Sequence, residues 1–243
     1  ALPVVFNGGA LAPARAATTP ALEAPVRVLL LEAPQARVEA ASGRLQVRDR
    51  DRRLLLTLPP AQGLRLQIGA DGGIRLEGPV ADDLPSPRLG RELWLEVASG
   101  PEDPMAPAAG DAPLTLEKRP YRGRLQVLVK AGQLRIINHV DLEAYLASVV
   151  GSEMPASWPQ QALRAQAVAA RTYALRERRP AEPFDLRATV ASQVYRGIEA
   201  ETPSTREAVQ ATRSQVLTYD GALIQAVFHS SSGVATEDSG AVW

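Results

Sequence analysis

Short segments in which apolar and polar residues alternate fill the chain from Val26 to Ala98. Gly, Pro or Asp-Gly, which form tight turns, separate them, so each segment is predicted to be a strand. No titratable cluster stands out among them, and this part is predicted to be a β-rich support or interaction module. The segments are VRVLLLE (26–32), ARVEAA (36–41), GRLQVRD (43–49), RLLLTL (53–58), LRLQIG (64–69), IRLEG (74–78) and ELWLEVA (92–98).

A loop and a hairpin are predicted next. Ser99–Pro113 is rich in Pro, Gly and Ala and has no apolar period, which is typical of a loop or linker. Arg124–Val129 and Leu134–Asn138 then alternate on either side of Ala131-Gly132, a pattern that indicates a β-hairpin.

The apolar period then becomes helical. The first predicted helix has Asp141 as its N-cap, and Gly151 is expected to end it in a left-handed conformation. A second, Ala-rich helix is expected from about Pro159 to Arg178, after a capping-box pattern at Ser157–Gln160. The apolar stripe of the first helix is Leu142, Tyr145, Leu146, Val149 and Val150.

The last part of the chain mixes short elements. Ser192–Gly197 is expected to be a short strand or a loop, and a capping box at Ser204–Glu207 predicts a helix that ends near Arg213. Val216–Tyr219 and Ala222–Phe228 are predicted strands around Asp220-Gly221, a strong hairpin signal. The polar run HSSSG (229–233) leaves the end of the second strand, where binding sites are commonly built.

Composition excludes several classes of function. The 243 residues suit one large domain or two small ones, and a formal net charge of zero provides no basic field for nucleic acid. The chain has no cysteine, which excludes disulfides, a thiolate nucleophile and cysteine zinc sites. Its two histidines give no metal-ligand spacing, and no nucleotide-binding glycine motif occurs, so neither a metal nor a cofactor is expected. Lys118 and Lys130 are the only lysines.

The first 25 residues have few charges and are rich in Ala and Pro. The APARA run has small residues at a spacing like that of a signal-peptide cleavage site, although no basic start precedes it. The segment therefore fits either the tail of a signal peptide or a flexible N-terminal segment.

Glu153 is a lone carboxylate in the stretch VVGSEMPASWP (149–159). Desolvation by its apolar neighbours would favour the neutral acid, the form that protonates a leaving oxygen in glycoside cleavage. A structural carboxylate that accepts a hydrogen bond from a backbone N–H at the next helix start is the alternative. The residues alone leave both readings open.

Other polar residues are candidates for binding. Arg171 and Tyr173 lie on the Ala-rich helix, and Arg171 is expected to meet either a ligand or an acid such as Glu143 or Glu153. Gln193 and Tyr195 offer an amide and an aromatic ring to a sugar.

The run that begins at His229 also offers polar side chains. His229, Ser231 and Ser232 are candidate hydrogen-bond donors to a polyol such as a glycan, or they cap their own backbone at the strand end. A serine hydrolase is disfavoured because no G-x-S-x-G motif occurs.

Three separated segments in order resemble the stage II sporulation protein D family, which includes proteins called amidase enhancers. They are NHVDLEAYLASVVGSEMPASWPQQALRAQAVAARTYAL, SQVYRGIEAE and AVQATRSQVLTYDGALIQAVFHSSSG, and the likeness covers about residues 121–243. It implies a peptidoglycan-binding protein, and some members are lytic transglycosylases that cleave between N-acetylmuramic acid and N-acetylglucosamine. One glutamate protonates the leaving oxygen, and the muramyl 6-hydroxyl closes on C1 to give a 1,6-anhydro end.

The resemblance assigns the catalytic glutamate to the SEMP motif, which here is Glu153. Two departures from the family accompany it: Ala191 and Ser192 stand where some relatives carry zinc ligands, and Val234 follows the HSSSG run instead of a second glycine. The expected substrate-binding residues are Arg171, Tyr173, Gln193, Tyr195, His229, Ser230, Ser231 and Ser232.

Together these observations predict an α+β protein with a long Ala-rich helix packed on β-hairpins. Residues 1–25 are expected to be a flexible segment, 26–117 a β-rich module, and 118–243 the glycan-binding and catalytic region, with its C-terminal lobe incomplete. The expected function is a lytic transglycosylase, and the alternative is a non-catalytic peptidoglycan-binding enhancer of a cell-wall amidase. Its expected partners are glycan strands and an amidase, with no nucleic acid. The expected location is extracytoplasmic, reached by export or by a membrane anchor outside this sequence.

Overall fold

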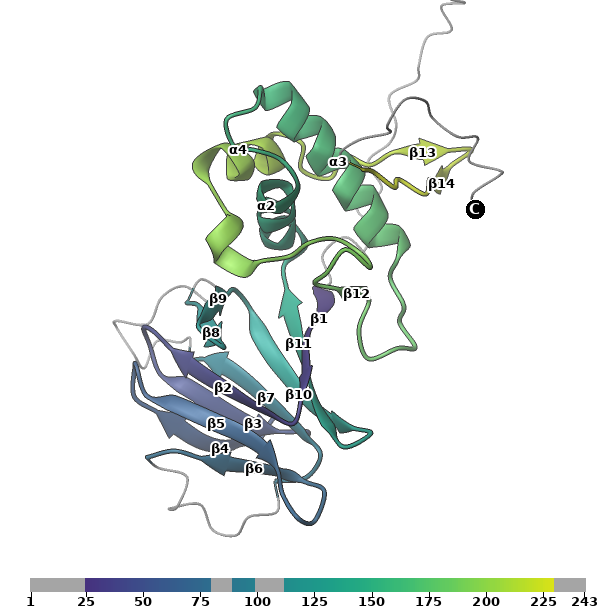
Figure 1. Cartoon of the computed structure of the whole chain (residues 1–243). Helices are drawn as coiled ribbons and strands as arrows, with labels where there is room; N and C mark the ends of the chain where they lie inside the picture. Colours follow the sequence, from purple (N-terminus) through teal and green to yellow (C-terminus); the bar gives the residue numbers. More distant parts are fainter. Residues whose placement is uncertain (1–24, 80–88, 99–111, 230–243) are drawn as a thin grey trace, which may run out of the picture.

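The computed structural model describes residues 25–79, 89–98 and 112–229, and these residues form an α+β fold. Two β-sheets lie at one end of the protein and a group of helices lies at the other (Figure 1). The fold class expected from the sequence is therefore confirmed.

The larger sheet has seven strands in the order β12-β1-β11-β10-β7-β3-β4. Neighbouring strands are antiparallel except β12, which runs parallel to β1. The strands are β1 (Val26–Ala33), β3 (Leu45–Asp49), β4 (Leu54–Leu58), β7 (Glu92–Val97), β10 (Arg124–Lys130), β11 (Gln133–Val140) and β12 (Leu186–Arg187).

The second sheet has five antiparallel strands in the order β6-β5-β2-β8-β9. Apolar residues of both sheets belong to one continuous core, because alternate residues along each strand point inward. The strands are β2 (Gln35–Ala40), β5 (Gly63–Ile68), β6 (Ile74–Glu77), β8 (Leu114–Leu116) and β9 (Arg119–Tyr121).

All seven strands predicted before residue 99 are present, and so is the β10–β11 hairpin. Ala131 and Gly132 form its turn with φ of 51° and 72°, the left-handed geometry that matches the twist of a two-residue hairpin. The sequence did not predict β8, β9 and β12. Their two or three residues are too few to show an alternating pattern.

The expected boundary between residues 117 and 118 falls inside a single structural unit. Strand β1 from the first half pairs along its length with β11 from the second half. Glu117 and Lys118 are themselves the two turn residues that join β8 to β9. The halves therefore share one sheet and one core. Of the expected flexible segment, residues 1–24 lie outside the described residues.

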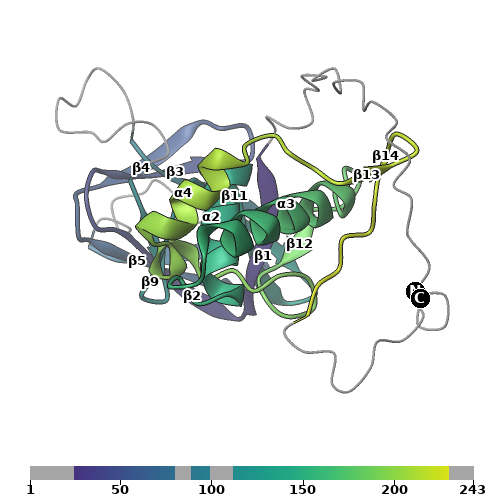
Figure 2. The same ribbon diagram turned by 90° about the horizontal axis from the view of Figure 1, so that it is seen from above.

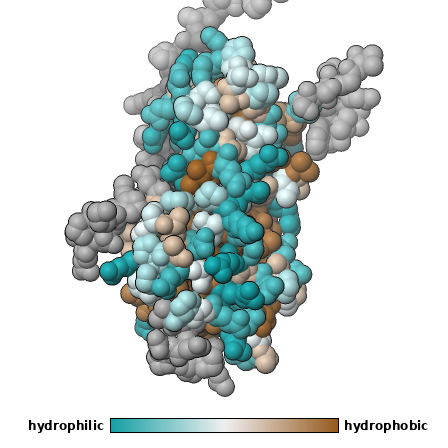
Figure 3. Space-filling view, turned by 60° about the vertical axis from the view of Figure 1, so that its left-hand side comes forward, coloured by the Kyte–Doolittle hydropathy of each residue, from teal (hydrophilic) through white to brown (hydrophobic). Residues whose placement is uncertain are grey.

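Three α-helices and a 3₁₀ helix make up the helical end of the described chain: α2 (Leu142–Glu153), α3 (Gln160–Arg176), η2 (Gly197–Ala200) and α4 (Pro203–Ala211). Seen from above, α2, α3 and α4 form one layer over the ends of the strands (Figure 2). No helix in the described part of the chain is long and apolar enough to cross a membrane. On the face that Figure 3 shows, hydrophobic residues form only small, scattered patches.

The start of α2 agrees with the prediction and its end does not. Asp141 caps the helix, and its carboxylate accepts hydrogen bonds from the backbone N–H groups of Glu143 and Ala144. The prediction that Gly151 ends the helix was wrong, because α2 continues to Glu153. A Cβ on Gly151 would lie 1.9 Å from the carbonyl oxygen of Ala200. This glycine therefore permits close packing of η2 on α2.

Two predicted capping boxes were also wrong. The N-cap of α3 is Pro159, which makes no side-chain capping bond. The capping box of α4 joins Thr202 and Thr205. Ser204 instead donates a hydrogen bond to the carbonyl oxygen of Ala156, 48 residues away in the chain. A tertiary contact has replaced the local bond that the pattern suggested.

The second hairpin is present but shorter than predicted. Only Thr218–Tyr219 (β13) and Ala222–Leu223 (β14) pair, around the expected Asp220-Gly221 turn with φ of 48° and 77°. Residues 192–196 form a loop, one of the two outcomes expected.

Candidate active site

Glu153 is the last residue of α2 and is partly buried at the corner before α3. Its Oε1 accepts a hydrogen bond from the backbone N–H of Val194 over 3.1 Å. Its Oε2 has no partner among the described residues and is not sealed from solvent. One carboxylate oxygen is thus fixed to the protein, and the other remains open to a ligand.

The loop that bonds Glu153 is itself held by the helices. Gln193 is buried, with 1% of its surface exposed. Its Oε1 accepts a hydrogen bond from the hydroxyl of Tyr145 over 3.0 Å, and its Nε2 donates to the carbonyl oxygen of Ala170 over 3.3 Å. On the other side of Val194, the N–H of Arg196 donates to Ser148 Oγ over 3.2 Å. These bonds fix the position of the Val194 N–H, which donates the hydrogen bond to Glu153.

Tyr195 anchors the same loop to the larger sheet. Its hydroxyl donates to Asn138 Oδ1 on β11 over 2.8 Å. Asn138 in turn donates to the carbonyl oxygens of Arg122 and Arg124, so its whole amide is bonded within the core. Burial raises the pKa of Tyr195, which keeps the hydroxyl protonated and available as a donor.

Tyr145 connects the members of the site, and the sequence analysis assigned it only to the core stripe of α2. Its ring packs against Tyr195 with centroids 5.0 Å apart. Burial is the main cause that raises its pKa well above the usual value, and the neighbouring Tyr195, Tyr173 and Glu153 act in the same direction. The one usable signal was a hydroxyl on an otherwise apolar stripe.

Gln193 and Tyr195 are therefore brought close to Glu153, but both side chains face the interior. Their buried hydrogen bonds position the loop and leave its backbone beside Glu153. Tyr173 is partly buried, and burial is the first cause that raises its pKa. Its hydroxyl interacts with Ser192 at the start of the loop.

Arg171 lies in the interior, away from any surface that a ligand could reach. Its side chain is 0% exposed and forms a two-point ion pair with Glu143, with distances of 2.9 and 2.6 Å. It also donates to the carbonyl oxygens of Gln215 and Val209. Of the partners expected from the sequence, the structure selects Glu143. These contacts of Arg171 hold the helices and the following segment together.

His229 is exposed and ends the described residues, so Ser230, Ser231 and Ser232 lie outside them. The hairpin before it is tied to α3: the N–H of Leu217 donates to Thr172 Oγ1, and Arg176 donates to the carbonyl oxygen of Leu223. No hydrogen bond or ion pair within the described ranges joins His229 to Glu153.

The corner loop also exposes an aromatic ring. Trp158, between α2 and α3, is 49% exposed, although its size and apolarity favour burial. In 25–79, 89–98 and 112–229, no three His, Cys, Asp or Glu residues are grouped so that they could hold a metal ion. The described site thus offers a carboxylate with one unbonded oxygen, and the same corner between α2 and α3 carries an exposed indole.

Comparisons with known proteins match the region that builds this site. Residues 130–219 match the model of the family described as stage II sporulation protein, SpoIID. An amidase enhancer of Bacillus subtilis is 45% identical over 98 residues, which cover 40% of this chain and 13% of that protein. Stage II sporulation protein D of Bacillus subtilis is 31% identical over 124 residues, or 44% of this chain and 36% of that protein.

An uncharacterized protein of Brachyspira hyodysenteriae is 35% identical over 128 residues, which cover 51% of this chain and 35% of that protein. The chain thus covers at most 36% of the length of any of these relatives. The matched family segment contains α2, α3, the loop at 192–196 and α4, and so includes Glu153 and its partners.

Proposed function

We propose that this chain cleaves peptidoglycan glycan strands as a lytic transglycosylase with Glu153 as its acid and base, a function suggested by the match of residues 130–219 to the stage II sporulation protein family model. The observation that carries the proposal is that only one of the two carboxylate oxygens of Glu153 is hydrogen-bonded to the protein. Val194 fixes Oε1, while Oε2 stays open at the corner. A proton donor needs this combination of fixed position and free reach.

The proposed reaction uses one carboxyl group twice. The protonated Oε2 gives its proton to the glycosidic oxygen as the bond between that oxygen and C1 of N-acetylmuramic acid breaks. The resulting carboxylate then takes the proton of the muramyl 6-hydroxyl as this oxygen forms its bond to C1. The products are a free hydroxyl on N-acetylglucosamine and a 1,6-anhydro ring, and no water is consumed.

One carboxylate suffices for this chemistry because the substrate supplies the nucleophile. Glycosidases that use water or a covalent intermediate place a second carboxylate about 5–10 Å from the first. Glu143, on the same helix, is occupied by its two-point ion pair with Arg171. The Glu153 site therefore suits a mechanism with an internal nucleophile.

Trp158 is proposed to bind a sugar ring beside the cleaved bond. Aromatic rings present a flat apolar face with a polar edge, and they often contribute much of the energy at binding surfaces. The exposure of Trp158 in the loop between α2 and α3 leaves its ring available to a ligand. Its replacement by Ala is expected to raise KM more than it lowers kcat.

A non-catalytic enhancer of a cell-wall amidase is the second candidate function. The observation in its favour is the 45% identity to an amidase enhancer over 98 residues, which is higher than the identity to the other relatives named above. In this case the same surface binds glycan strands and brings them to an amidase. Both functions require an extracytoplasmic location, in the periplasm or cell wall.

Mass spectrometry of glycan strands from which the peptides have been removed distinguishes the two functions. A transglycosylase releases fragments that end in 1,6-anhydro-N-acetylmuramic acid. An enhancer sediments with the strands, releases no such fragments and accelerates an added amidase. If the protein neither binds the glycan strands nor releases such fragments, both proposals are contradicted.

A further inference from the structure

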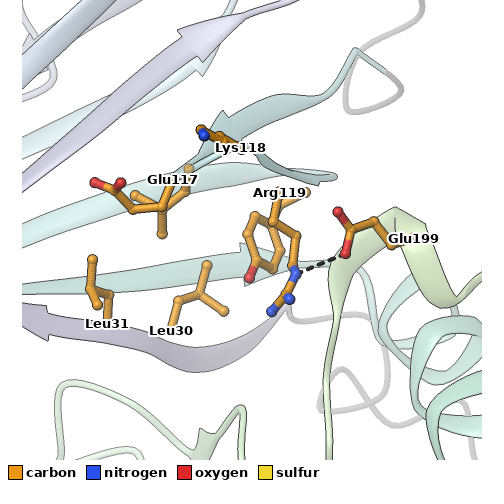
Figure 4. Close-up of a pocket in the computed structure, with 8 residues that line it drawn as sticks. Leu30, Leu31, Glu117, Lys118, Arg119 and Glu199 are labelled. Atoms are coloured by element: carbon orange, nitrogen blue, oxygen red, sulfur yellow. Dashed lines mark hydrogen bonds and ion pairs between the residues drawn. The ribbon is translucent and has the colours of Figure 1, made fainter.

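A pocket lies between β1, the β8–β9 hairpin and η2, and Glu153 is not among its lining residues. Its volume is about 350 Å³, at the lower end of the range for small-ligand sites, roughly 300–1,000 Å³. None of its lining residues belongs to α2 or to the loop at 192–196. They are Leu30, Leu31, Leu116, Glu117, Lys118, Arg119, Tyr121 and Glu199 (Figure 4).

A β-bulge builds the apolar side of this pocket. Successive residues of a regular strand point to opposite faces, so Leu30 and Leu31 would not normally line one pocket. The pairing of β1 with β11 shifts register between Leu29 and Leu31, which re-aims the side chains at this point. Figure 4 shows Leu30 and Leu31 side by side below the hairpin. The side chains of Leu30 and Leu31 thus form one apolar wall of the pocket.

Charged residues line the opposite side. Arg119 and Glu199 form an ion pair of 2.9 Å that closes one end of the pocket. Glu117 uses Oε1 to accept a hydrogen bond from the N–H of Arg37 over 2.7 Å. Lys118 has no carboxylate partner in the described part of the chain, and no dashed line reaches it in Figure 4. The ammonium group of Lys118 and Oε2 of Glu117 therefore both line the pocket without an ion-pair partner among the described residues.

The two residues of this hairpin turn have left-handed backbone conformations, as in the other two-residue hairpins of the protein, although neither is glycine. Glu117 and Lys118 have φ of 48° and 74°, in the left-handed region that favours Gly and Asn. Such a conformation costs a residue with a side chain about 1 kcal/mol. Non-glycine residues held there are often found at binding sites. Lys118 is also one of only two lysines in a chain with 27 basic residues.

We propose that this pocket binds a small aliphatic zwitterion, namely an amino acid or a short peptide with free termini. The aliphatic side chain of the ligand packs on Leu30 and Leu31. Its carboxylate pairs with Lys118, and its ammonium group pairs with Glu117. The lining has two cations and two carboxylates, so a neutral molecule with separated charges matches it better than a net anion does.

The test is titration of the ¹⁵N-labelled protein with the dipeptide L-alanyl-L-leucine, followed by NMR. We expect saturable shifts of the backbone amides of the pocket residues Leu30, Leu31, Glu117, Lys118, Arg119 and Tyr121. Lys118→Met and Glu117→Gln are each expected to weaken binding about fivefold, the effect of one partly exposed ion pair. Lys130→Met, which removes the other lysine, leaves binding unchanged.

The same dipeptide with both ends blocked, as the N-acetyl amide, is expected to bind at least about fivefold more weakly because each terminal charge contributes an ion pair. Equal binding of the blocked dipeptide would overturn the proposal, as would unchanged binding by Lys118→Met. Absence of saturable shifts up to about 10 mM, beyond the range of useful small-ligand affinity, would overturn it too. The spectra themselves report whether each variant is folded.

Discussion

Glu153 Oε1 and the backbone N–H of Val194 form a hydrogen bond of 3.1 Å across 41 residues of sequence. This bond joins the end of α2 to the loop that follows β12. Because a backbone donor cannot change rotamer, it orients the carboxylate without using a second charged side chain. The loop is in turn fixed by Gln193 and Tyr195, so the placement of Glu153 depends on residues that face the core.

Tyr145→Phe tests whether this support matters for activity. The change removes the hydroxyl that donates to Gln193 Oε1 and leaves a buried acceptor without its partner. We expect a loss of about 1–3 kcal/mol in unfolding free energy and a lower kcat with little change in KM. Tyr219→Phe is the matched control, because Tyr219 is 75% exposed. Denaturant unfolding and steady-state rates give both readings, and an unchanged kcat in folded Tyr145→Phe would contradict the supporting role.

Arg171→Met distinguishes a structural arginine from a substrate contact. The change leaves Glu143 without its buried partner, and breaking such a pair typically costs about 3–5 kcal/mol. We expect a correspondingly lower midpoint in urea unfolding. Arg171→Lys should rescue only part of the loss, since an ammonium group cannot form the two-point pair. Full stability with weakened glycan binding would instead assign Arg171 to the ligand. Arg213→Met, at an exposed position after α4, is the control.

Gly151→Ala tests the close contact of α2 with η2. The new methyl group would lie 1.9 Å from the carbonyl oxygen of Ala200, so one backbone must move. Overpacking of this kind costs about 1–3 kcal/mol or more, even though Ala is the better helix former. Ser152→Ala is a control on the same turn, because Ser152 Oγ is buried without a partner and its loss is expected to be neutral or stabilising. A Gly151→Ala variant as stable as the wild type would contradict the packing described.

His139 predicts a pH dependence of stability. Burial, followed by repulsion from Arg124 and Arg27, lowers its pKa from 6.5 to about 4, while Asp185 acts in the opposite direction. Between these values the unfolded chain binds a proton that the folded chain does not, so stability falls as the pH decreases from 6.5 to 4. The loss from this residue amounts to at most about 3 kcal/mol. This loss of stability reaches its full size below about pH 4.

His139→Gln removes this titration and can retain a polar contact with Gln126. Urea unfolding at several pH values between 4 and 7 measures the effect. We expect the variant to show a flatter dependence than the wild type in this range. The same slope in both proteins would show that other groups cause the loss.

Most strands, and the turns of the β10–β11 and β13–β14 hairpins, could be predicted because alternation and turn residues are local signals. Features that depend on tertiary contacts could not be predicted from the local pattern. Gly151 was predicted to end the helix because glycine commonly does so. The sequence does not show that the backbone of η2 packs against this residue. Ser204 matched a cap, but its hydroxyl found Ala156 instead. Pairing of β1 with β11, far apart in the chain, removed the expected boundary between two halves.

The candidate site shows the same division. Glu153 is a candidate because of its apolar setting and its motif, and the structure places Gln193 and Tyr195 on the loop that bonds it. The direction in which their side chains point could not be derived, because a loop has no period that separates inside from outside. Arg171 could be assigned neither to a ligand nor to one acid until its position relative to Glu143 was known.

Glu153→Gln, analysed by mass spectrometry of peptide-free glycan strands, tests the central claim most directly. The amide oxygen of Gln can still accept the hydrogen bond from Val194, so the fold and glycan binding are expected to survive. Removing the acid should lower the rate of 1,6-anhydro product formation by at least about 10²–10⁴-fold, the usual contribution of general acid–base catalysis. Glu207→Gln, at an exposed position on α4, should retain wild-type activity. Formation of the anhydro products at the wild-type rate by folded Glu153→Gln would contradict the account.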